Sequence, residues 1–176
     1  MQPKHNNEAL WQESHLVVQQ LLAMIDYSPG LEIQQFALES MVRLTASTVG
    51  FIYAIDSQAK TARLENMIKS GQESRFIPWS PTENLADGGL WSPCLTTALP
   101  PLCPVADILD PVLGNLHSGL VVPVHNSGEL VAVIGVANGA VPYQKPDSEV
   151  LLEMASALGR VVVRKKLHDS MPDDIK

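Results

Sequence analysis

Two cysteines and five histidines are the side chains in this sequence best suited to nucleophilic, redox or metal chemistry. Cys94 and Cys103 are separated by eight residues, which is not a spacing used by known metal sites, and two thiols are too few for a disulfide framework. The sequence contains no H-x3-H or C-x2-C pair. It therefore predicts reduced, buried thiols and no structural zinc site.

His117 directly precedes an apolar segment at 118 to 124. An imidazole there can face a pocket as a haem ligand, proton donor or pH-sensitive contact, or it can be a hydrogen-bonded histidine of a surface loop. The sequence has no G-x-G-x-x-G, Walker or G-x-S-x-G motif, and its acidic residues form no clear catalytic pair. These residues favour binding over catalysis.

Composition limits the partners. With 45% apolar and 18% charged residues, the 176-residue chain fits one globular domain. A formal net charge of -7 argues against nucleic acid as a partner, because binding its phosphates requires clustered Lys and Arg. Apolar runs such as 130 to 137 are too short to cross a membrane. We expect a cytoplasmic protein with no membrane or nucleic-acid partner.

The spacing of apolar residues along the chain predicts the helices and strands that must position these side chains. Apolar residues recur at helical spacing in 8 to 25 and again in 31 to 45, so two helices precede any strand. Residues 47 to 56 and 61 to 69 predict a hairpin, with Ala62, Leu64, Asn66 and Ile68 sharing one face.

The second half continues with an irregular segment, a second hairpin and a long helix. Segment 70 to 117 carries most of the prolines and one short helical match at 89 to 99. Residues 118 to 124 and 129 to 138 flank "HNSG" and predict a second hairpin, and 147 to 167 predict a long helix.

Strands joined by short turns require an antiparallel sheet. We therefore predict an α+β fold in which a central antiparallel sheet of about 5-6 strands carries N- and C-terminal helices packed on one face. The apolar stripe of the last helix, which includes Leu158, is wide, and the first helix is separately amphipathic. One helix face can meet the sheet while another meets a second subunit, so we expect a homodimer.

Four stretches in this order resemble a GAF domain, the sensory module of histidine kinases, phytochromes and diguanylate cyclases. They are "LTASTVGFIYAID", "GLWSPCLTTALPPLCPVADI", "GLVVPVHNSGELVAVIGVAN" and an N-x4-Y-x3-D pattern at Asn138, Tyr143 and Asp147. The resemblance implies an N-terminal helix and turn at 1–30, a GAF-like sensory domain at 31–168, and a polar tail or the start of a linker at 169–176.

The resemblance also implies a ligand pocket between the sheet and segment 70 to 117, which we call the cover segment. The candidate ligand-binding residues are Phe51, Tyr53, Trp91, Cys94, Leu95, Asp107, His117 and Val122. The alternative is that the apolar members only fill the core. Neither a ligand nor a cofactor is identified by the sequence.

In the GAF resemblance, the residues after the last strand form the junction between the sheet and the C-terminal helix. Asn138 and Gly139 tolerate positive φ, the prolines that follow stiffen the chain, and Asp147 can accept backbone N–H groups at the helix start. The sequence departs from the family at Gly139, where related domains have Lys, and at Gln144, where many have Ser or Thr. Ala106 replaces the Asn that usually precedes Asp107, and Leu116 stands where bilin-binding members have Cys.

The resemblance implies that a metabolite bound under the cover segment regulates an output domain or partner, such as a kinase or a cyclic-di-nucleotide enzyme. One alternative is a ligand-free dimerisation module. Another is a thiol-dependent reductase of free methionine sulfoxide using Cys94 or Cys103, although the nucleophile of that subgroup falls at 109 to 117, where this chain has no cysteine.

Overall fold

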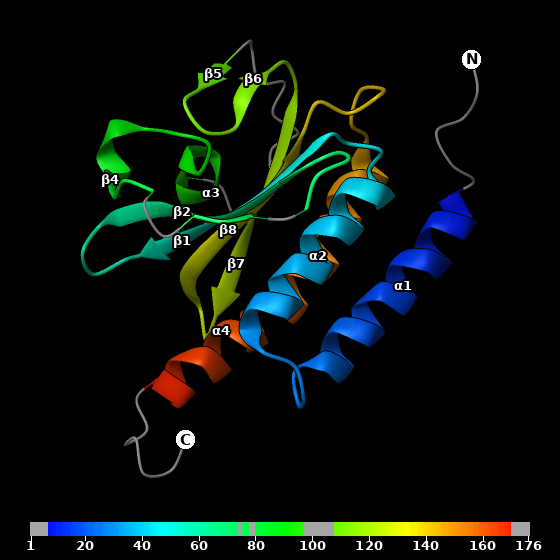
Figure 1. The fold of residues 1–176 in the computed structure, drawn as a ribbon, viewed down its shortest axis with the longest axis horizontal. Coiled ribbons are helices and arrows are strands. Elements are labelled where there is room, and N and C mark those ends of the chain that lie inside the picture. The colour runs from blue at the N-terminus through cyan, green and yellow to red at the C-terminus, as the bar shows by residue number, and fades with distance from the viewer. Residues whose placement is uncertain (1–6, 74, 78–79, 97–107, 170–176) are drawn as a thin grey trace.

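The computed structural model describes residues 7–73, 75–77, 80–96 and 108–169, and the side chains of these residues as far as 160, except those of 76, 96 and 108. Helices and strands follow the expected order (Figure 1). They are α1 (Asn7–Met24), α2 (Gly30–Leu44), β1 (Val49–Asp56), β2 (Thr61–Lys69), β3 (Arg75–Phe76), β4 (Glu83–Asn84), η1 (Leu85–Asp87), α3 (Ser92–Thr96), β5 (Ile108–Asp110), β6 (Gly114–Leu116), β7 (Gly119–Asn126), β8 (Glu129–Ala137) and α4 (Lys145–Asp169).

The sheet is antiparallel at every strand pair, in the order β3-β2-β1-β8-β7, with β4 also paired to β2. The two predicted hairpins, β1–β2 and β7–β8, are present and meet where β1 pairs with β8. A separate short hairpin, β5–β6, precedes β7. The predicted α+β fold with a central antiparallel sheet is therefore confirmed.

Both faces of the central strands are covered. The first six residues of β7 and the last seven of β8 are buried, which explains why these segments read as continuous apolar runs. Ile52, Val122 and Ile134 pack with α2 and α4 in one apolar cluster. Phe51 and Val133 pack on the other side with residues of the cover segment. We call these sides the helix face and the cover face.

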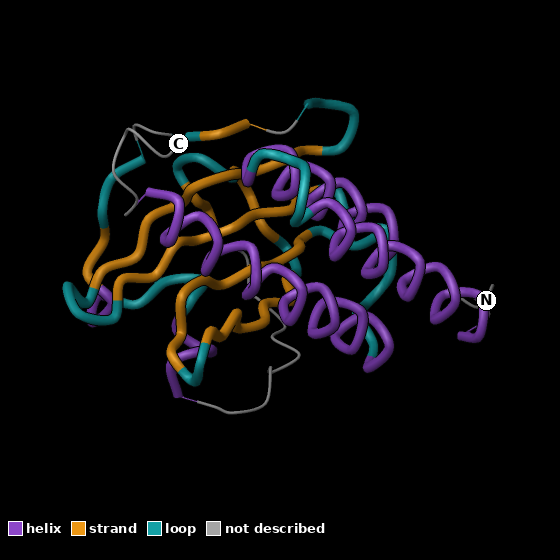
Figure 2. The backbone as a smooth tube through the Cα atoms, turned by 90° about the horizontal axis from the view of Figure 1, so that it is seen from below, coloured by secondary structure: helices purple, strands orange, loops and turns teal. Residues whose placement is uncertain are grey.

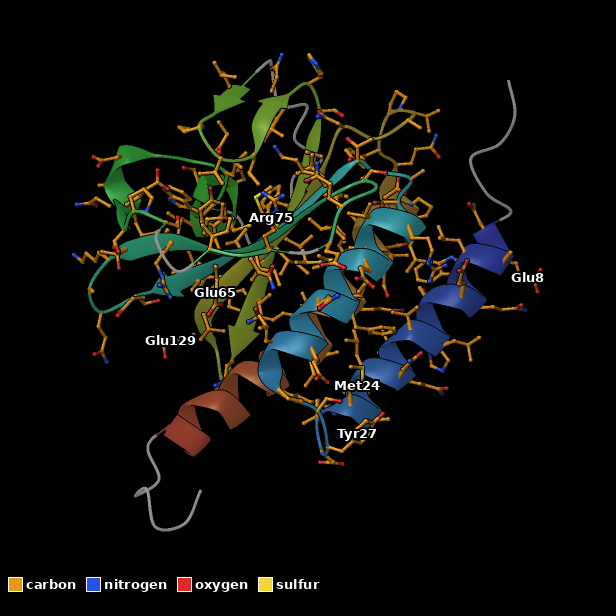
Figure 3. All side chains as sticks on the ribbon, viewed as in Figure 1. Glu8, Met24, Tyr27, Glu65, Arg75 and Glu129 are labelled. Atoms are coloured by element: carbon orange, nitrogen blue, oxygen red, sulfur yellow. The ribbon has the colours of Figure 1, made fainter. Side chains whose placement is uncertain are left out.

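The helices form two layers over the helix face. α2 packs on β1 and β2, α4 packs on β7 and β8, and α1 packs on α2 and α4 outside them (Figures 1 and 2). An ion pair between Arg43 of α2 and Glu13 of α1 adds to the apolar contact. Tyr27, in the turn between α1 and α2, points away from the sheet (Figure 3). None of the helices in the described ranges is long and apolar enough to cross a membrane.

Two details of the predicted strands are wrong. The register between β1 and β2 shifts at Ile52/Tyr53, so Glu65 bulges out and the side-chain alternation changes face. Ala62 and Leu64 lie on the cover face, whereas Ile68 lies on the helix face. Asn66, paired with Ile52, shares that helix face.

The second detail is the turn of the β7–β8 hairpin. His125 and Asn126 belong to β7, and the connection is only Ser127 and Gly128, both with positive φ. A two-residue turn of this kind matches the twist of antiparallel strands. The predicted four-residue turn "HNSG" is therefore too long.

Candidate functional site

Three aromatic rings gather on the cover face. The Phe51 and Tyr53 ring centroids are 5.9 Å apart, and those of Tyr53 and Trp91 are 5.2 Å apart, both edge to face. The Phe51 ring lies so close to β8 that a Cβ on Gly135 would be 2.4 Å from its Cζ, which leaves room only for glycine. The rings therefore form a packed floor under the cover segment.

Trp91 has a polar atom that this packing does not satisfy. Its side chain is buried, and its indole Nε1 has no hydrogen-bond partner among the described residues. A buried donor without an acceptor costs about 1–3 kcal/mol. The indole N–H is therefore available to an acceptor on this side of the sheet.

Acidic groups lie near the Tyr53 hydroxyl. Burial raises the pKa of Tyr53 well above its usual range, and the carboxylates of Asp110 and Glu83 raise it further. Burial also raises the pKa of the Glu83 carboxyl, with Asp110 and Asp87 adding repulsion. One Asp110 oxygen is already committed, since it accepts the backbone N–H groups of Val112 and Leu113 at 2.8 and 2.7 Å.

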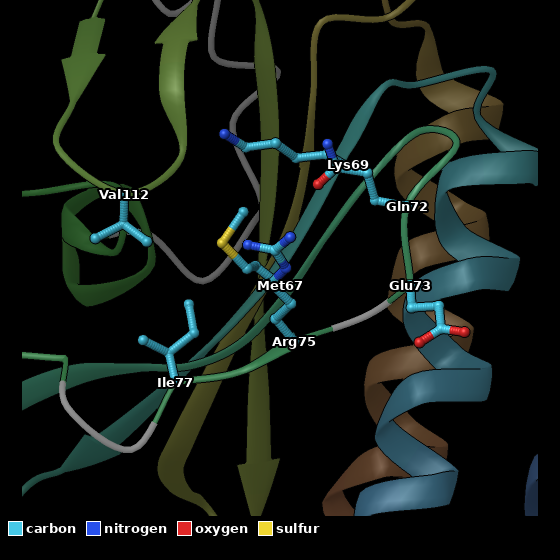
Figure 4. A pocket seen from close by; sticks show the side chains of 7 residues that line it. All are labelled: Met67, Lys69, Gln72, Glu73, Arg75, Ile77 and Val112. Carbon is cyan, nitrogen blue, oxygen red and sulfur yellow. The ribbon is translucent and has the colours of Figure 1, made fainter.

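A cavity of about 270 Å³ opens at the β2–β3 end of the cover face (Figure 4). Its floor is apolar and joins the aromatic cluster, because Met67 and Ile77 are buried members of that cluster. Its rim is polar, with two basic side chains, one acidic side chain and one amide. The lining residues are Met67, Lys69, Gln72, Glu73, Arg75, Ile77 and Val112.

The structure brings four of the eight predicted site residues together. Phe51, Tyr53, Trp91 and Cys94 belong to one buried cluster on the cover face. Leu95 is next to Cys94 in α3, but its side chain is 41% exposed.

The other three predicted residues lie elsewhere. Val122 packs on the helix face, opposite the aromatic rings, and its neighbour Val121 takes the place expected for it. His117 is exposed, and its backbone N–H donates to Asn138 Oδ1 at 2.7 Å. Asp107 lies outside the described residues.

Sequence reasoning missed the basic rim and the floor of the cavity. β3 is only two residues long, too short to show a period, so the sequence predicts an irregular segment at Arg75. Met67 reaches the cover face only because of the bulge at Glu65. The one available signal was the pair of cations, Lys69 and Arg75, on either side of the turn after β2.

The described part of this region offers few side chains for thiol or metal chemistry. Cys94 is buried, and Cys103 lies outside the described residues. Across the ranges that the structure describes, no three His, Cys, Asp or Glu side chains come together to hold a metal ion.

The joint after β8 is held by side-chain hydrogen bonds. Asn138 has a φ of 54°, as the sequence predicts for this position, and its Nδ2 donates to the Asn115 carbonyl at 2.9 Å while its Oδ1 accepts from His117. The backbone N–H of Asn138 donates to Ser118 O at 2.9 Å. One residue therefore ties the end of β8 to β6 and to the start of β7.

A chain of hydroxyl groups then links the helix layer across this joint. The Tyr143 hydroxyl is 2.7 Å from Ser47 Oγ, which is 2.7 Å from Thr45 Oγ1, and Thr45 donates to the Met41 carbonyl at the end of α2. Burial raises the pKa of Tyr143 to about 12, although hydrogen bonds with Ser47 and the Gly139 backbone act in the opposite direction.

The start of α4 is capped as predicted. Asp147 Oδ2 accepts the backbone N–H of Gln144 at 2.7 Å, and the backbone N–H of Asp147 donates to the Gln144 carbonyl at 3.0 Å. This is the reciprocal half of a capping box, with the carboxylate at the positive end of the helix dipole. α4 therefore begins at a defined point relative to the sheet.

Known proteins resemble this chain in both sequence and fold. A GAF domain family model matches residues 31–163. A methyl sulfide methyltransferase-associated sensor of Methanosarcina acetivorans is 26% identical over 151 residues, which is 80% of this chain but only 15% of that protein.

Two solved structures share the fold. The GAF domain of a phosphoenolpyruvate-protein phosphotransferase from Coxiella burnetii gives a TM-score of 0.71 at 14% identity, covering 95% of this chain and all of that one. The GAF domain of a putative sensor histidine kinase from Pseudomonas syringae pv. tomato gives 0.58 at 13% identity, covering 89% of this chain and 90% of that one.

Proposed function

Because the chain belongs to the GAF domain family, we propose that it is a sensory domain, in which a small molecule binds on the cover face of the sheet and alters the arrangement of the helices on the other. The ligand enters beside Phe51, Tyr53, Trp91 and Cys94 and displaces the cover segment. The helices α2 and α4 pass the change to an output domain or a partner signalling protein in the cytoplasm.

The main support for this proposal is that two central strands, β1 and β8, contribute side chains to both faces of the sheet. In β1, Phe51 and Tyr53 face the cover and Ile52 between them faces the helices. In β8, Val133 and Ile134 divide in the same way. A close-packed interior has few voids, so a ligand that moves the first set also moves the strand that carries the second.

The joint after β8 gives such a displacement a route to α4. Asn138 binds β6 and β7, and Tyr143 binds the segment after α2, so the start of α4 follows the end of the sheet. A ligand shifts the helix equilibrium only through its different affinity for the two arrangements. A tenfold population change requires a tenfold difference in affinity, or about 1.4 kcal/mol.

The experiment is a thermal-shift screen of the full chain with nucleotides, amino acids, haem and bilins. A ligand present at 100 times its Kd adds about 2.7 kcal/mol to stability, which is about 5 to 10 °C for a domain of this size. Hydrogen exchange of α4 with each binder then tests the response of the helices. Absence of any binder would contradict the proposal.

Exposed leucines favour a second candidate, a ligand-free dimerisation module. Leu158 cannot contribute to a dimer surface because it is buried in the chain's own helix-face core. Leu16 of α1 is 64% exposed and Leu152 of α4 is 37% exposed. α1 and α4 are neighbours, and a contiguous exposed apolar patch is typical of a partner surface.

Sedimentation distinguishes this candidate. Leu16→Glu and Leu152→Glu should dissociate a helix-face dimer, whereas Leu109→Glu, at an 80% exposed position on β5, should not. A dimer with no ligand in the screen supports the module, and a monomer at all concentrations rules it out.

A further inference from the structure

The cavity at the β2–β3 end of the cover face has an unusual charge for this protein. Two of its seven lining residues, Lys69 and Arg75, are cations, although the whole chain carries a formal net charge of -7. We propose that this cavity binds a small organic anion, a carboxylate or phosphate ester with a compact apolar body. The assignment rests on the proposed function in placing the ligand on the cover face.

Neither Lys69 nor Arg75 is neutralised by a residue that the structure describes. Within the described ranges, Lys69 and Arg75 form no ion pair and no side-chain hydrogen bond. The one carboxylate of the lining, that of Glu73, is turned away from both cationic groups (Figure 4). An ammonium and a guanidinium that share a concave site are suited to a carboxylate or phosphate, which accepts hydrogen bonds from both.

The floor sets the rest of the ligand's chemistry. Met67 is 6% exposed and Ile77 is 2% exposed, and Val112 packs against the same apolar cluster. A hydrated inorganic ion would leave this surface without a contact. A ligand with an apolar body would cover it, so a carboxylate or phosphate alone should bind more weakly than the same group on a small ring.

The position of the cavity connects it to the cover segment. Val112 lies in the turn of the β5–β6 hairpin, and a Cβ on Gly114, the first residue of β6, would be 3.7 Å from Lys69 Nζ. The hairpin therefore rests against one of the two cations. An anion held by Lys69 and Arg75 would contact the sheet on one side and this hairpin on the other.

The cover face also offers an acidic group of side chains, which would suit a cation. Glu83 and Asp110 lie near Tyr53, but one Asp110 oxygen is committed to two backbone N–H groups. The cavity described above is lined by neither of them. The cavity therefore suits an anion better than a cation.

The test uses the full chain and four probes that share a ring. Benzoate and phenyl phosphate are anions, benzamide is a neutral analogue of benzoate, and benzylamine is a cation. In calorimetric or NMR titrations, both anions should bind saturably, shifting the methyl signals of Met67 and Val112, and benzamide should bind at least tenfold more weakly. Acetate and inorganic phosphate report the contribution of the apolar body.

Substitutions assign the binding to the two cations. Lys69→Gln and Arg75→Gln should each weaken benzoate binding by about tenfold or more, because each removes a charge-assisted hydrogen bond. Arg63→Gln is the matched control and should leave binding unchanged. Arg63 is a cation of β2, like Lys69, but it does not line the cavity. Circular dichroism checks that each variant folds.

The outcomes separate this inference from the proposed function. Benzamide binding as tightly as benzoate, unchanged binding in both variants, or no anion binding would overturn the anion site. If benzylamine or another compound binds instead and alters α4, the sensory function stands without it. If benzoate binds through Lys69 and Arg75 without any change in α4, the anion site stands and the sensory function does not.

Discussion

α4 approaches β7 closely at Gly159, and this contact allows a direct test of how the helix is held. Gly159 is buried, and a Cβ added there would lie 2.5 Å from the carbonyl oxygen of His125 in β7. Ordinary contacts begin at 3.4 Å, so in Gly159→Ala the helix or the hairpin must move by about 0.9 Å. The neighbour is backbone and cannot change rotamer.

Two opposing effects set the change in the free energy of unfolding of Gly159→Ala. Alanine in place of glycine stabilises a helix interior by about 0.8–1.0 kcal/mol. Forcing an extra methyl group into a packed contact costs about 1–3 kcal/mol. The net expectation for Gly159→Ala is a loss of about 1 kcal/mol, or about 2–4 °C in Tm.

Urea denaturation and hydrogen exchange provide the assay. Ser156→Ala, at an exposed position of the same helix, is the control, because it changes helix propensity without a new contact and should be slightly stabilising. In Gly159→Ala the amides around His125 should exchange faster. If this variant is instead as stable as Ser156→Ala and exchange around His125 is unchanged, α4 does not rest on β7 as described.

Three further substitutions test other parts of the structure. In Tyr143→Phe, loss of the hydroxyl that meets Ser47 should cost about 1 kcal/mol at neutral pH. Because the pKa of Tyr143 is raised from 10.0 to about 12, its contribution to stability is complete below pH 10 and is lost as the pH rises through 12, so the variant should lose less stability than wild type over that interval in urea titrations at several pH values. Asn66→Leu should raise the urea midpoint, gaining about 1–3 kcal/mol, since the Asn66 amide is buried with neither Nδ2 nor Oδ1 hydrogen-bonded among the described residues; a lower midpoint would show that the amide has a partner. Trp91→Ala should cost about 3–5 kcal/mol, and a loss below 1 kcal/mol in thermal denaturation would mean that the cover segment is not packed on the sheet.

The sequence predicted the local parts of this fold well because they depend on short-range patterns. The two long hairpins follow from apolar runs separated by turn residues, and the capping of α4 follows from Asp147 at its first turn. The pairing of β1 with β8 joins residues more than 70 positions apart, so no local period reveals it. The order of the strands in the sheet is therefore not predicted by the sequence.

The candidate site was predicted only in part, and the reason is register. In a strand, a shift of one residue moves a side chain to the opposite face. Val121 and Val122 are identical in type, so the sequence does not indicate which one faces the cover. The bulge at Glu65 likewise places Met67 on the cover face, and no turn residue or glycine in the sequence predicts that bulge.

Hydrogen exchange of the wild-type protein, with and without saturating benzoate or whichever screened compound binds, tests the sensory account most directly. The account predicts changed protection on the cover face, around β2 and β6, together with changed protection in α2 and at the start of α4, at residues 145 to 152. Protection confined to the cover face, with identical exchange in both helices, would contradict it.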